Sequence, residues 1–301
     1  MVSTPAIKIQ HLHKKFGSVP ALQDVSLTVE QGEFFALLGS NGAGKTTLIS
    51  ILAGLARADS GAAAIMGHDV VSEYRLSRQL LGVVPQELAY DPFFSVRESL
   101  RMQSGYFGLR RNDDWIDEIL LNLGLSNKAD ANMRALSGGM KRRVLVAQAL
   151  VHKPPVIILD EPTAGVDVEL RQSLWTFVRQ LNADGHTIML TTHYLEEAEA
   201  LCNRVAMLKQ GRIVALDRTA NLLKNASELK LQLTVKSGTL PLDLLSRALN
   251  HDGNNYTFAM TAPAELEPIL AQLRIAGIEI EHLSLSQPDL EDVFVQIMGR
   301  A

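Results

Sequence analysis

Apolar and polar positions along the first part of the chain alternate between strand-like and helix-like spacing. Residues 7–12 and 22–29 alternate or run apolar as strands do, with a Gly17-Ser18 turn between them. Residues 34–38 form a continuous apolar run that is typical of a buried strand, and a glycine-rich segment follows. From Lys45 onward, apolar residues recur at helical spacing, at Leu48, Ile51, Leu52 and Leu55. The pattern predicts a strand, a glycine loop and a helix in succession.

The stretch from about residue 87 to residue 155 has a mostly helical pattern. One apolar stripe within it consists of Trp115, Ile116, Ile119, Leu120 and Leu123, and Gly124 then breaks the pattern. Two continuous apolar runs, residues 156–159 and 187–191, predict further buried strands. Residues 205–208 and 212–215, on either side of Gln210-Gly211, predict a hairpin.

After about residue 225 the pattern changes to strict alternation. The first alternating segment carries Leu229, Leu231, Leu233 and Val235, and the second carries Tyr256, Phe258, Met260 and Ala262. Between them a helix is predicted from Leu242, Leu245 and Leu249, and after them a second helix from Leu266, Ile269, Leu270 and Leu273. Ile278 and Ile280 begin a third predicted strand, and residues 289–298 form a last helix. This order predicts a small α/β domain with its own core.

Composition narrows the possible classes of protein. A chain of 301 residues suits one large domain with an appendage. Its apolar runs are far shorter than the roughly 20 residues of a spanning helix, and its first residues lack a signal-peptide pattern. A net charge of -4 argues against nucleic acid as the main partner. The single cysteine, Cys202, indicates a reducing compartment and suits a small buried position.

A run of small residues after the strand at residues 34–38 has the spacing of a Walker A phosphate loop. It consists of Gly39, Ser40, Asn41, Gly42, Ala43, Gly44, Lys45 and Thr46, with Thr47 next in the helix. Glycines let backbone N–H groups converge on phosphate oxygens, and the helix N-terminus adds positive potential. In such a loop Lys45 meets the β- and γ-phosphates and the Thr46 hydroxyl ligates Mg²⁺. A chance glycine turn is the alternative, which the flanking strand and helix disfavour.

The apolar run at residues 156–159 ends in two carboxylates, Asp160 and Glu161. Carboxylates at the end of a buried strand are costly unless a cation or water lies beside them. Asp160 therefore suits a Mg²⁺ site, and Glu161 suits a residue that orients or deprotonates an attacking water. The alternative is a solvated acidic loop, which the phosphate loop earlier in the chain disfavours.

A third motif, Leu136-Ser137-Gly138-Gly139, lies between the first two and precedes a helical run beginning at Val144. By itself it fits an ordinary serine N-cap followed by glycines. In this order along the chain, it resembles the signature sequence of the ABC ATPase family. The resemblance covers roughly residues 6–225 with all motifs in order.

Single residues match further positions of that family. Gln86 resembles the Q-loop glutamine, which senses Mg²⁺ and the γ-phosphate, and Asp167 resembles the D-loop acid. His193 resembles the switch histidine that touches the γ-phosphate, although a lone histidine after a strand is often structural. Phe16 matches the aromatic that stacks on adenine, where the family more often has tyrosine; packing at a sheet edge is the alternative. Met140 stands where many members carry glutamine, and methionine at this position recurs in the drug- and polysaccharide-export branch of the family, which this chain resembles.

The resemblance implies an α/β fold of the P-loop NTPase class. The ABC ATPase domain is expected over residues 6–225, with an antiparallel β subdomain and an α-helical subdomain at about residues 87–155. A small C-terminal α/β domain is expected over residues 226–301, with a regulatory or dimerising role. Residues 289–294 resemble the tail of multidrug-exporter ATPases, although their acids also suit a helix N-terminus.

The resemblance also implies partners. Family geometry joins two ATPase chains, identical or related, head to tail, so that Ser137, Gly138 and Gly139 of one chain close on the ATP held by the other. Hydrolysis is expected to drive export by separate integral membrane permease subunits, with the chain on the cytoplasmic face of the membrane. Residues 90–94 offer aromatic side chains either for docking or for core packing. The alternatives are a non-transport ABC ATPase, disfavoured by the single motif set, and an importer subunit, disfavoured by Met140 and the tail.

Overall fold

The computed structural model describes residues 4–87, 89–225, 229–236, 240–260 and 262–299, and it divides the chain into two compact units. The first unit ends at Arg218 and the second begins at Thr219. The division lies before helix α8 (Thr219–Asn225), whereas the sequence predicted a boundary after it. The difference has a physical reason, because α8 contacts helix α11 (Leu290–Gly299) of the second unit.

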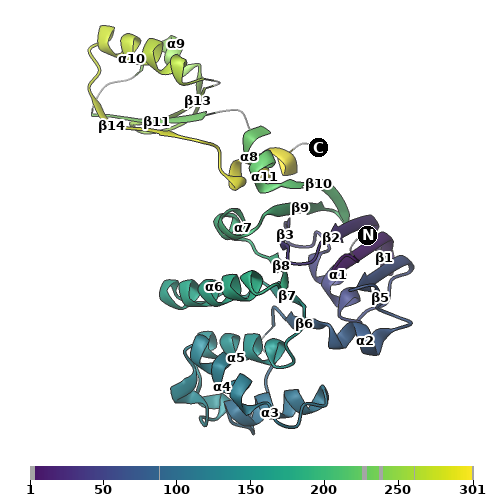
Figure 1. Cartoon of the computed structure of the whole chain (residues 1–301). Coiled ribbons are helices and arrows are strands. Elements are labelled where there is room, and N and C mark those ends of the chain that lie inside the picture. The colour runs from purple at the N-terminus through teal and green to yellow at the C-terminus, as the bar shows by residue number, and fades with distance from the viewer. Residues whose placement is uncertain (1–3, 88, 226–228, 237–239, 261, 300–301) are drawn as a thin grey trace. The chain divides into compact units, whose positions relative to one another are not determined.

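A six-stranded sheet forms the centre of the first unit (Figure 1). Its strand order is β10-β9-β3-β8-β7-β6. The bounds are β3 (Phe34–Gly39), β6 (Leu81–Val84), β7 (Val156–Asp160), β8 (Thr187–Thr191), β9 (Arg204–Lys209) and β10 (Arg212–Arg218). All pairs are parallel except β9 with β10, which form the predicted hairpin. Because β3, β8 and β7 are parallel neighbours, their carboxyl ends and the loops that follow them meet at one edge of the sheet.

A second sheet, antiparallel throughout, has the order β2-β1-β4-β5. Its strands are β1 (Ile7–Phe16), β2 (Val19–Val29), β4 (Ser60–Ile65) and β5 (His68–Asp69). Both β1 and β2 run further toward their connecting turn than predicted. Register shifts along the pair, with positive φ at His11 and Asp24, let pairing continue where the apolar alternation ends.

The helices of the first unit begin with α1 (Lys45–Leu52), which follows the glycine loop as predicted. The others are α2 (Tyr74–Gln79), α3 (Val96–Tyr106), α4 (Asp113–Asn122), α5 (Gly138–Leu150), α6 (Val168–Ala183) and α7 (Leu195–Leu201), with short 3₁₀ turns at Ser126–Lys128 and Met133–Ala135. In α4 the predicted stripe buries Ile116, Ile119 and Leu120. Cys202 is buried, as expected, and burial raises the pKa of its thiol.

The second unit contains a four-stranded antiparallel sheet with the order β12-β13-β11-β14. Its elements are β11 (Leu229–Val235), α9 (Leu242–Leu245), β12 (Ala248–Asp252), β13 (Asn255–Met260), a 3₁₀ turn (Pro263–Glu265), α10 (Leu266–Ile275), β14 (Ile280–Ser286) and α11. The helix predicted through Leu249 is wrong in its second half. Leu249 lies in strand β12 and is 62% exposed, because pairing with β13 replaces the local helical spacing.

Candidate functional site

The glycine loop between β3 and α1 has a backbone that side chains would not tolerate. A Cβ atom on Gly39 would lie 2.5 Å from the Leu208 carbonyl oxygen, and one on Gly44 would lie 2.5 Å from the Ala21 carbonyl oxygen. Gly44 also has φ 111° and forms the N-cap of α1. The loop therefore delivers unobstructed N–H groups to the N-terminus of a helix, which is the arrangement that binds phosphate.

Lys45 lies inside this loop and is 8% exposed. Its ammonium donates hydrogen bonds to the carbonyl oxygens of Gly39, at 2.7 Å, and Ser40, at 3.2 Å. Burial lowers the pKa of Lys45, and the nearby charges of Glu161 and Asp160 oppose that shift. The residues of the loop that face solvent are Ser40, Asn41, Gly42 and Thr46, whereas Ala43 is buried and Thr47 is half-buried.

Asp160 is the last residue of β7 and is 4% exposed. The Thr191 hydroxyl, at the end of neighbouring β8, donates a hydrogen bond to its carboxylate. Burial raises the pKa of Asp160, with the nearby Glu161 charge acting in the same direction, while the Thr191 hydrogen bond opposes it. A cation placed beside a carboxyl whose ionisation burial disfavours would strongly stabilise its charged form.

Glu161 begins the turn after β7 in a left-handed backbone conformation, with φ 49°. Its N–H donates to the Thr191 carbonyl oxygen at 3.0 Å, which continues the pairing of β7 with β8 past the end of the strand. The Gln86 amide donates to the Glu161 Oε2 atom at 3.1 Å, and the His193 Nδ1 atom lies 3.5 Å from the same oxygen. Positive φ is rare for a residue with a side chain, and such strain concentrates at functional sites.

The structure thus brings Gln86 and His193, each from a separate loop, to the carboxylate of Glu161. Lys45 and Asp160 lie close enough for their charges to act on each other. Glu161 was expected from the two acids that end an apolar run, and Gln86 and His193 were expected from the resemblance to the ABC ATPase family. The neighbouring parallel strands β8, β7 and β6 explain why the loops that carry these residues meet.

The signature motif begins helix α5, and the Ser137 side chain caps it by accepting from the Met140 N–H at 3.3 Å. Ser137 and Gly138 are exposed, and Gly139 is half-buried. Two basic residues just inside the helix reach the segment after β6. Arg142 donates to the Pro85 carbonyl oxygen at 2.7 Å, and Lys141 donates to the Tyr90 hydroxyl at 3.1 Å. These contacts join the signature helix to the loop that carries Gln86.

Two further predicted residues lie on the surface of the first unit. Phe16, at the end of β1, is 56% exposed, with the Lys14 ammonium 5.3 Å from its ring centroid. Asp167 is exposed just before α6, and its carbonyl oxygen accepts from the Arg171 N–H at 2.9 Å. Phe16 therefore does not plug the sheet edge, which was the structural alternative for this ring.

Sequence reasoning missed two polar residues next to the site. Thr191 contacts Asp160, and Glu197 of α7 is a buried carboxylate that contacts the segments on either side of it. Glu197 follows His193 by four residues, and helix α7 begins between them, at Leu195. A charged residue four positions after His193 was the available signal, but its burial is a property of the tertiary structure.

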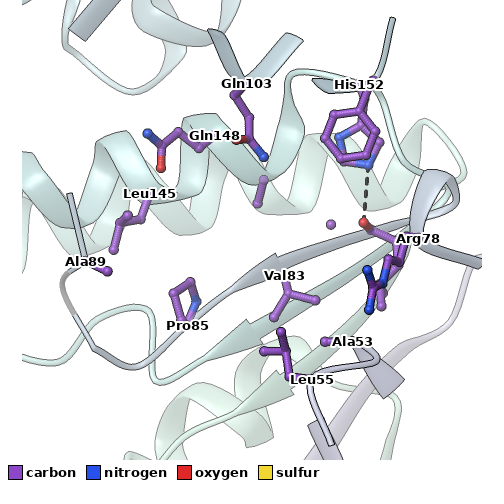
Figure 2. Close-up of a pocket in the computed structure, with 14 residues that line it drawn as sticks. Ala53, Leu55, Arg78, Val83, Pro85, Ala89, Gln103, Leu145, Gln148 and His152 are labelled. Carbon is purple, nitrogen blue, oxygen red and sulfur yellow. Dashed lines mark hydrogen bonds between the residues drawn. The ribbon is translucent and has the colours of Figure 1, made fainter. Parts of the chain in front are cut away.

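A groove lies beside the Gln86 loop, between α5 and β6, with a volume of about 370 Å³. Figure 2 shows Gln103, Leu145 and Gln148 on its helical side and Val83, Pro85 and Leu55 on the other side. Leu55 is 81% exposed. Of the aromatic residues at positions 90–94, Phe93 is 77% exposed, whereas Tyr90 and Phe94 are half-buried. The groove thus has largely apolar walls and lies next to the loop that carries Gln86.

Within the described residues, no helix is long and apolar enough to cross a membrane.

Comparison with known proteins places this site in a family. The family model for ABC transporters matches residues 22–164. The chain is 39% identical to the Nod factor export ATP-binding protein I of Burkholderia lata, over 98% of this chain and 97% of that protein. It is 32% identical to the linearmycin resistance ATP-binding protein LnrL of Bacillus subtilis, over 98% of each.

Solved structures agree with the sequence comparison. A dimeric ATP-binding cassette in a post-hydrolysis state, bound to ADP and Pi, matches with a TM-score of 0.64 and 27% identity, covering 71% of this chain and 98% of that one. The ATP-binding subunit of another ABC transporter matches with a TM-score of 0.69 and 27% identity, covering 73% of this chain and 92% of that one. The predicted fold class is confirmed, and the chain belongs to the ABC transporter ATP-binding proteins of the exporter type, whose activity is ATP hydrolysis.

Proposed function

We propose that Glu161 orients and deprotonates the water that attacks the γ-phosphate, and that Gln86 and His193 hold its carboxylate for this step. The observation that carries the proposal is the meeting of both side chains at the Glu161 Oε2 atom. A carboxylate held between an amide donor and an imidazole has a fixed orientation, and a general base needs a fixed orientation to reach the proton that it removes. Strained backbone at Glu161 further restricts where that carboxylate can point.

ATP binds, on this proposal, along the glycine loop. Lys45 turns its ammonium from the carbonyl oxygens of Gly39 and Ser40 toward the β- and γ-phosphates. The loop N–H groups from Ser40 to Thr47 and the α1 N-terminus bind the remaining phosphate oxygens. The exposed ring of Phe16 stacks on adenine.

The residues at the end of β7 and the start of α1 fit Mg²⁺. Asp160 is a carboxyl whose pKa is raised by burial, and Thr46 offers an exposed hydroxyl at the helix N-terminus. Hard oxygen donors of this kind, together with the Gln86 amide oxygen, suit that ion. Bound there, Mg²⁺ would neutralise charge on the β- and γ-phosphates.

Two ATPase chains, copies or relatives, are proposed to pair head to tail around the nucleotide. Ser137 and Gly138 are exposed at the N-terminus of the 13-residue helix α5, where backbone N–H groups and the helix dipole favour an anion. The related cassette bound to ADP and Pi is described as dimeric. Asp167, exposed before α6, is proposed to contact the partner chain as the D-loop acid.

The membrane partner is proposed to be a pair of separate permease subunits at the cytoplasmic face of the membrane, which the chain drives to export a substrate. The relatives named for Nod factor export and linearmycin resistance support an export role. The groove between α5 and β6 suits a short helix of such a subunit, because its walls carry apolar side chains and its rim adjoins Gln86. Exposed Phe93 extends this apolar surface.

Replacing Glu161 by Gln tests the assignment. This variant keeps the side-chain shape and removes the base, so ATP hydrolysis should fall by about 10²–10⁴-fold while ATP binding persists. ATP should then trap a stable dimer, seen as a doubled mass in light scattering. Glu196→Gln, which changes an exposed acid of α7, serves as the control and should keep the wild-type rate of ATP hydrolysis. Near-normal phosphate release by Glu161→Gln would remove Glu161 from its role.

A further inference from the structure

Glu197 is a buried carboxylate that the proposed chemistry does not use. It lies in α7 and is 6% exposed. Its oxygens accept hydrogen bonds from the Thr163 hydroxyl, at 2.9 and 3.1 Å, from the Thr192 hydroxyl, at 3.0 Å, and from the Trp175 indole N–H, at 3.2 Å. The Arg171 Nε atom lies 3.6 Å from the same carboxylate.

The partners of Glu197 come from three different segments. Thr163 follows Glu161 by two residues in the turn that leaves β7. Thr192 lies between β8 and His193. Arg171 and Trp175 lie on α6, the helix that begins just after Asp167. One carboxylate therefore holds together the segments that carry the proposed base, the switch histidine and the D-loop acid.

Secondary contacts strengthen the arrangement around His193. The Thr192 hydroxyl also accepts from the Tyr194 N–H at 3.0 Å, which closes a turn around the histidine. The Arg171 guanidinium lies 4.5 Å from the centroid of the Tyr194 ring. The two threonines are 1% and 2% exposed, so water does not compete for their hydroxyl groups.

A buried ion of this kind is poorly explained as a source of stability alone. Desolvating a carboxylate and a guanidinium costs about as much as their attraction returns, so apolar residues would serve the fold equally well. A fully hydrogen-bonded buried network does, however, fix the groups that compose it in one arrangement. Such fixation matters most where reacting groups must be held in place.

We propose that Glu197 is a positioning residue for ATP hydrolysis. It fixes the turn after β7 and the segment before His193 relative to each other through the hydroxyls of Thr163 and Thr192, and it fixes both relative to α6 through the Trp175 indole N–H. This inference rests on the roles proposed above for Glu161 and His193. Glu197 does not itself touch the reacting atoms. It sets the distances from which Glu161 and His193 act.

The test replaces each threonine by valine, which keeps the shape and removes the hydroxyl. Thr163→Val and Thr192→Val should each lower kcat by roughly tenfold or more while the KM for ATP stays within about twofold, because positioning is lost and binding is not. Thr163→Ser and Thr192→Ser restore the hydroxyl and should recover most of the rate. Thr176→Val is the matched control, because the Thr176 hydroxyl bonds only locally, to the Gln172 carbonyl oxygen, among its described contacts.

A second variant guards against loss of folding. Glu197→Asp keeps the charge but shortens the side chain by one methylene, and it should lower kcat even at temperatures well below its melting midpoint, where the variant is fully folded. Valine variants that melt earlier but hydrolyse ATP at the wild-type kcat would overturn the inference, as would serine variants as slow as the valine ones. If Glu161→Gln is inactive while both valine variants are fully active, only this inference fails. An active Glu161→Gln would instead contradict the proposed catalytic base.

Discussion

The six-stranded sheet of the first unit and the four-stranded sheet of the second unit bury different kinds of residue. At the carboxyl ends of β3, β7 and β8, Lys45, Asp160 and Glu197 are all buried. In the second unit, the cluster of buried residues against the sheet is apolar and includes Leu231 and Phe258. Among the described residues of this unit, Thr219 is the only polar residue that is buried.

The backbone differs in the same way. Glu161, in the turn after β7, has positive φ. The described positive φ angles of the second unit belong to Gly253 and Gly277, which adopt them without strain. Among the described residues, positive φ at a residue with a side chain is thus confined to the first unit, where it occurs at Glu161 and also at His11, Asp24, Met66, Lys153 and Gln210. Glu161 differs from the other five because it directly follows a buried charged residue, Asp160, and this coincidence is the pattern expected where strain serves a function.

The largest effect that tests this contrast is expected from Lys45→Ala. The variant removes the one buried ammonium of the glycine loop, so ATP should bind about 10–100-fold more weakly, since hydrogen bonds to charged groups contribute roughly 1.5–3 kcal/mol. Isothermal titration calorimetry measures the affinity. Lys236→Ala, in the second unit, is the control and should bind ATP normally. Unchanged affinity in Lys45→Ala would show that the glycine loop is not the phosphate site.

Asp160→Asn is expected to separate activity from stability. The variant should lose most of its Mg²⁺-dependent ATP hydrolysis, because the carboxylate proposed to hold the ion is gone. In the absence of nucleotide and Mg²⁺ it should melt at a higher temperature, because burial of this carboxyl disfavours its charged form. Calorimetric melting and phosphate release report the two effects. A lower melting midpoint would show that the buried charge stabilises the fold.

Removal of the second unit is expected to leave the chemistry intact. A chain ending at Arg218 keeps every predicted site residue and cuts before α8, so it should hydrolyse ATP within about twofold of the full chain, as expected for a unit with its own core. Pairing of chains without nucleotide should weaken, as seen by analytical ultracentrifugation, if this unit dimerises or regulates. Loss of hydrolysis in a soluble, folded truncation would contradict the division of labour.

A point variant gives the same comparison within the full chain. Phe258 is 1% exposed in the core of the second unit, so Phe258→Ala should destabilise that unit by about 3–5 kcal/mol. The melting transition of the second unit should move while ATP hydrolysis at low temperature stays unchanged. A parallel fall in hydrolysis would show that the two units are energetically linked.

The smallest effect concerns His152, beside the groove of Figure 2. Its ring stacks on Phe107 with centroids 3.6 Å apart, and burial lowers its pKa from 6.5 to about 4. Between these values the unfolded chain binds a proton that the folded chain does not, so stability falls as pH falls through that window. When the pH falls from 7 to 5, the free energy of unfolding should therefore decrease by about 2 kcal/mol less in His152→Gln than in the wild type.

Urea unfolding at the two pH values measures this difference. His251→Gln, which changes an exposed histidine of β12, is the control and should match the wild type. An acid sensitivity of His152→Gln equal to that of the wild type would contradict the assignment to this ring.

Much of the site follows from the sequence because its motifs are local. A glycine loop between an apolar strand and a helix has few other uses, and Asp160 with Glu161 could be recognised from the strand they end. The second unit was harder to predict. Leu242, Leu245 and Leu249 have helical spacing, yet Leu249 lies in β12, because the pairing of that strand with β13 outweighs a short helical preference.

By itself, the sequence determined which residues are predicted to meet phosphate and the order of the elements that carry them. The local geometry of the loops that carry these residues depends on neighbouring residues, chiefly the glycines and the acids that end a strand. Only the tertiary structure decided that Glu161 lies within reach of Gln86 and His193, that Arg142 ties α5 to the Gln86 loop, and that Glu197 is buried between three segments. Most of these contacts join residues far apart in the sequence, up to 75 positions for Gln86 and Glu161, and the parallel order of the strands, rather than local preference, brings such residues together.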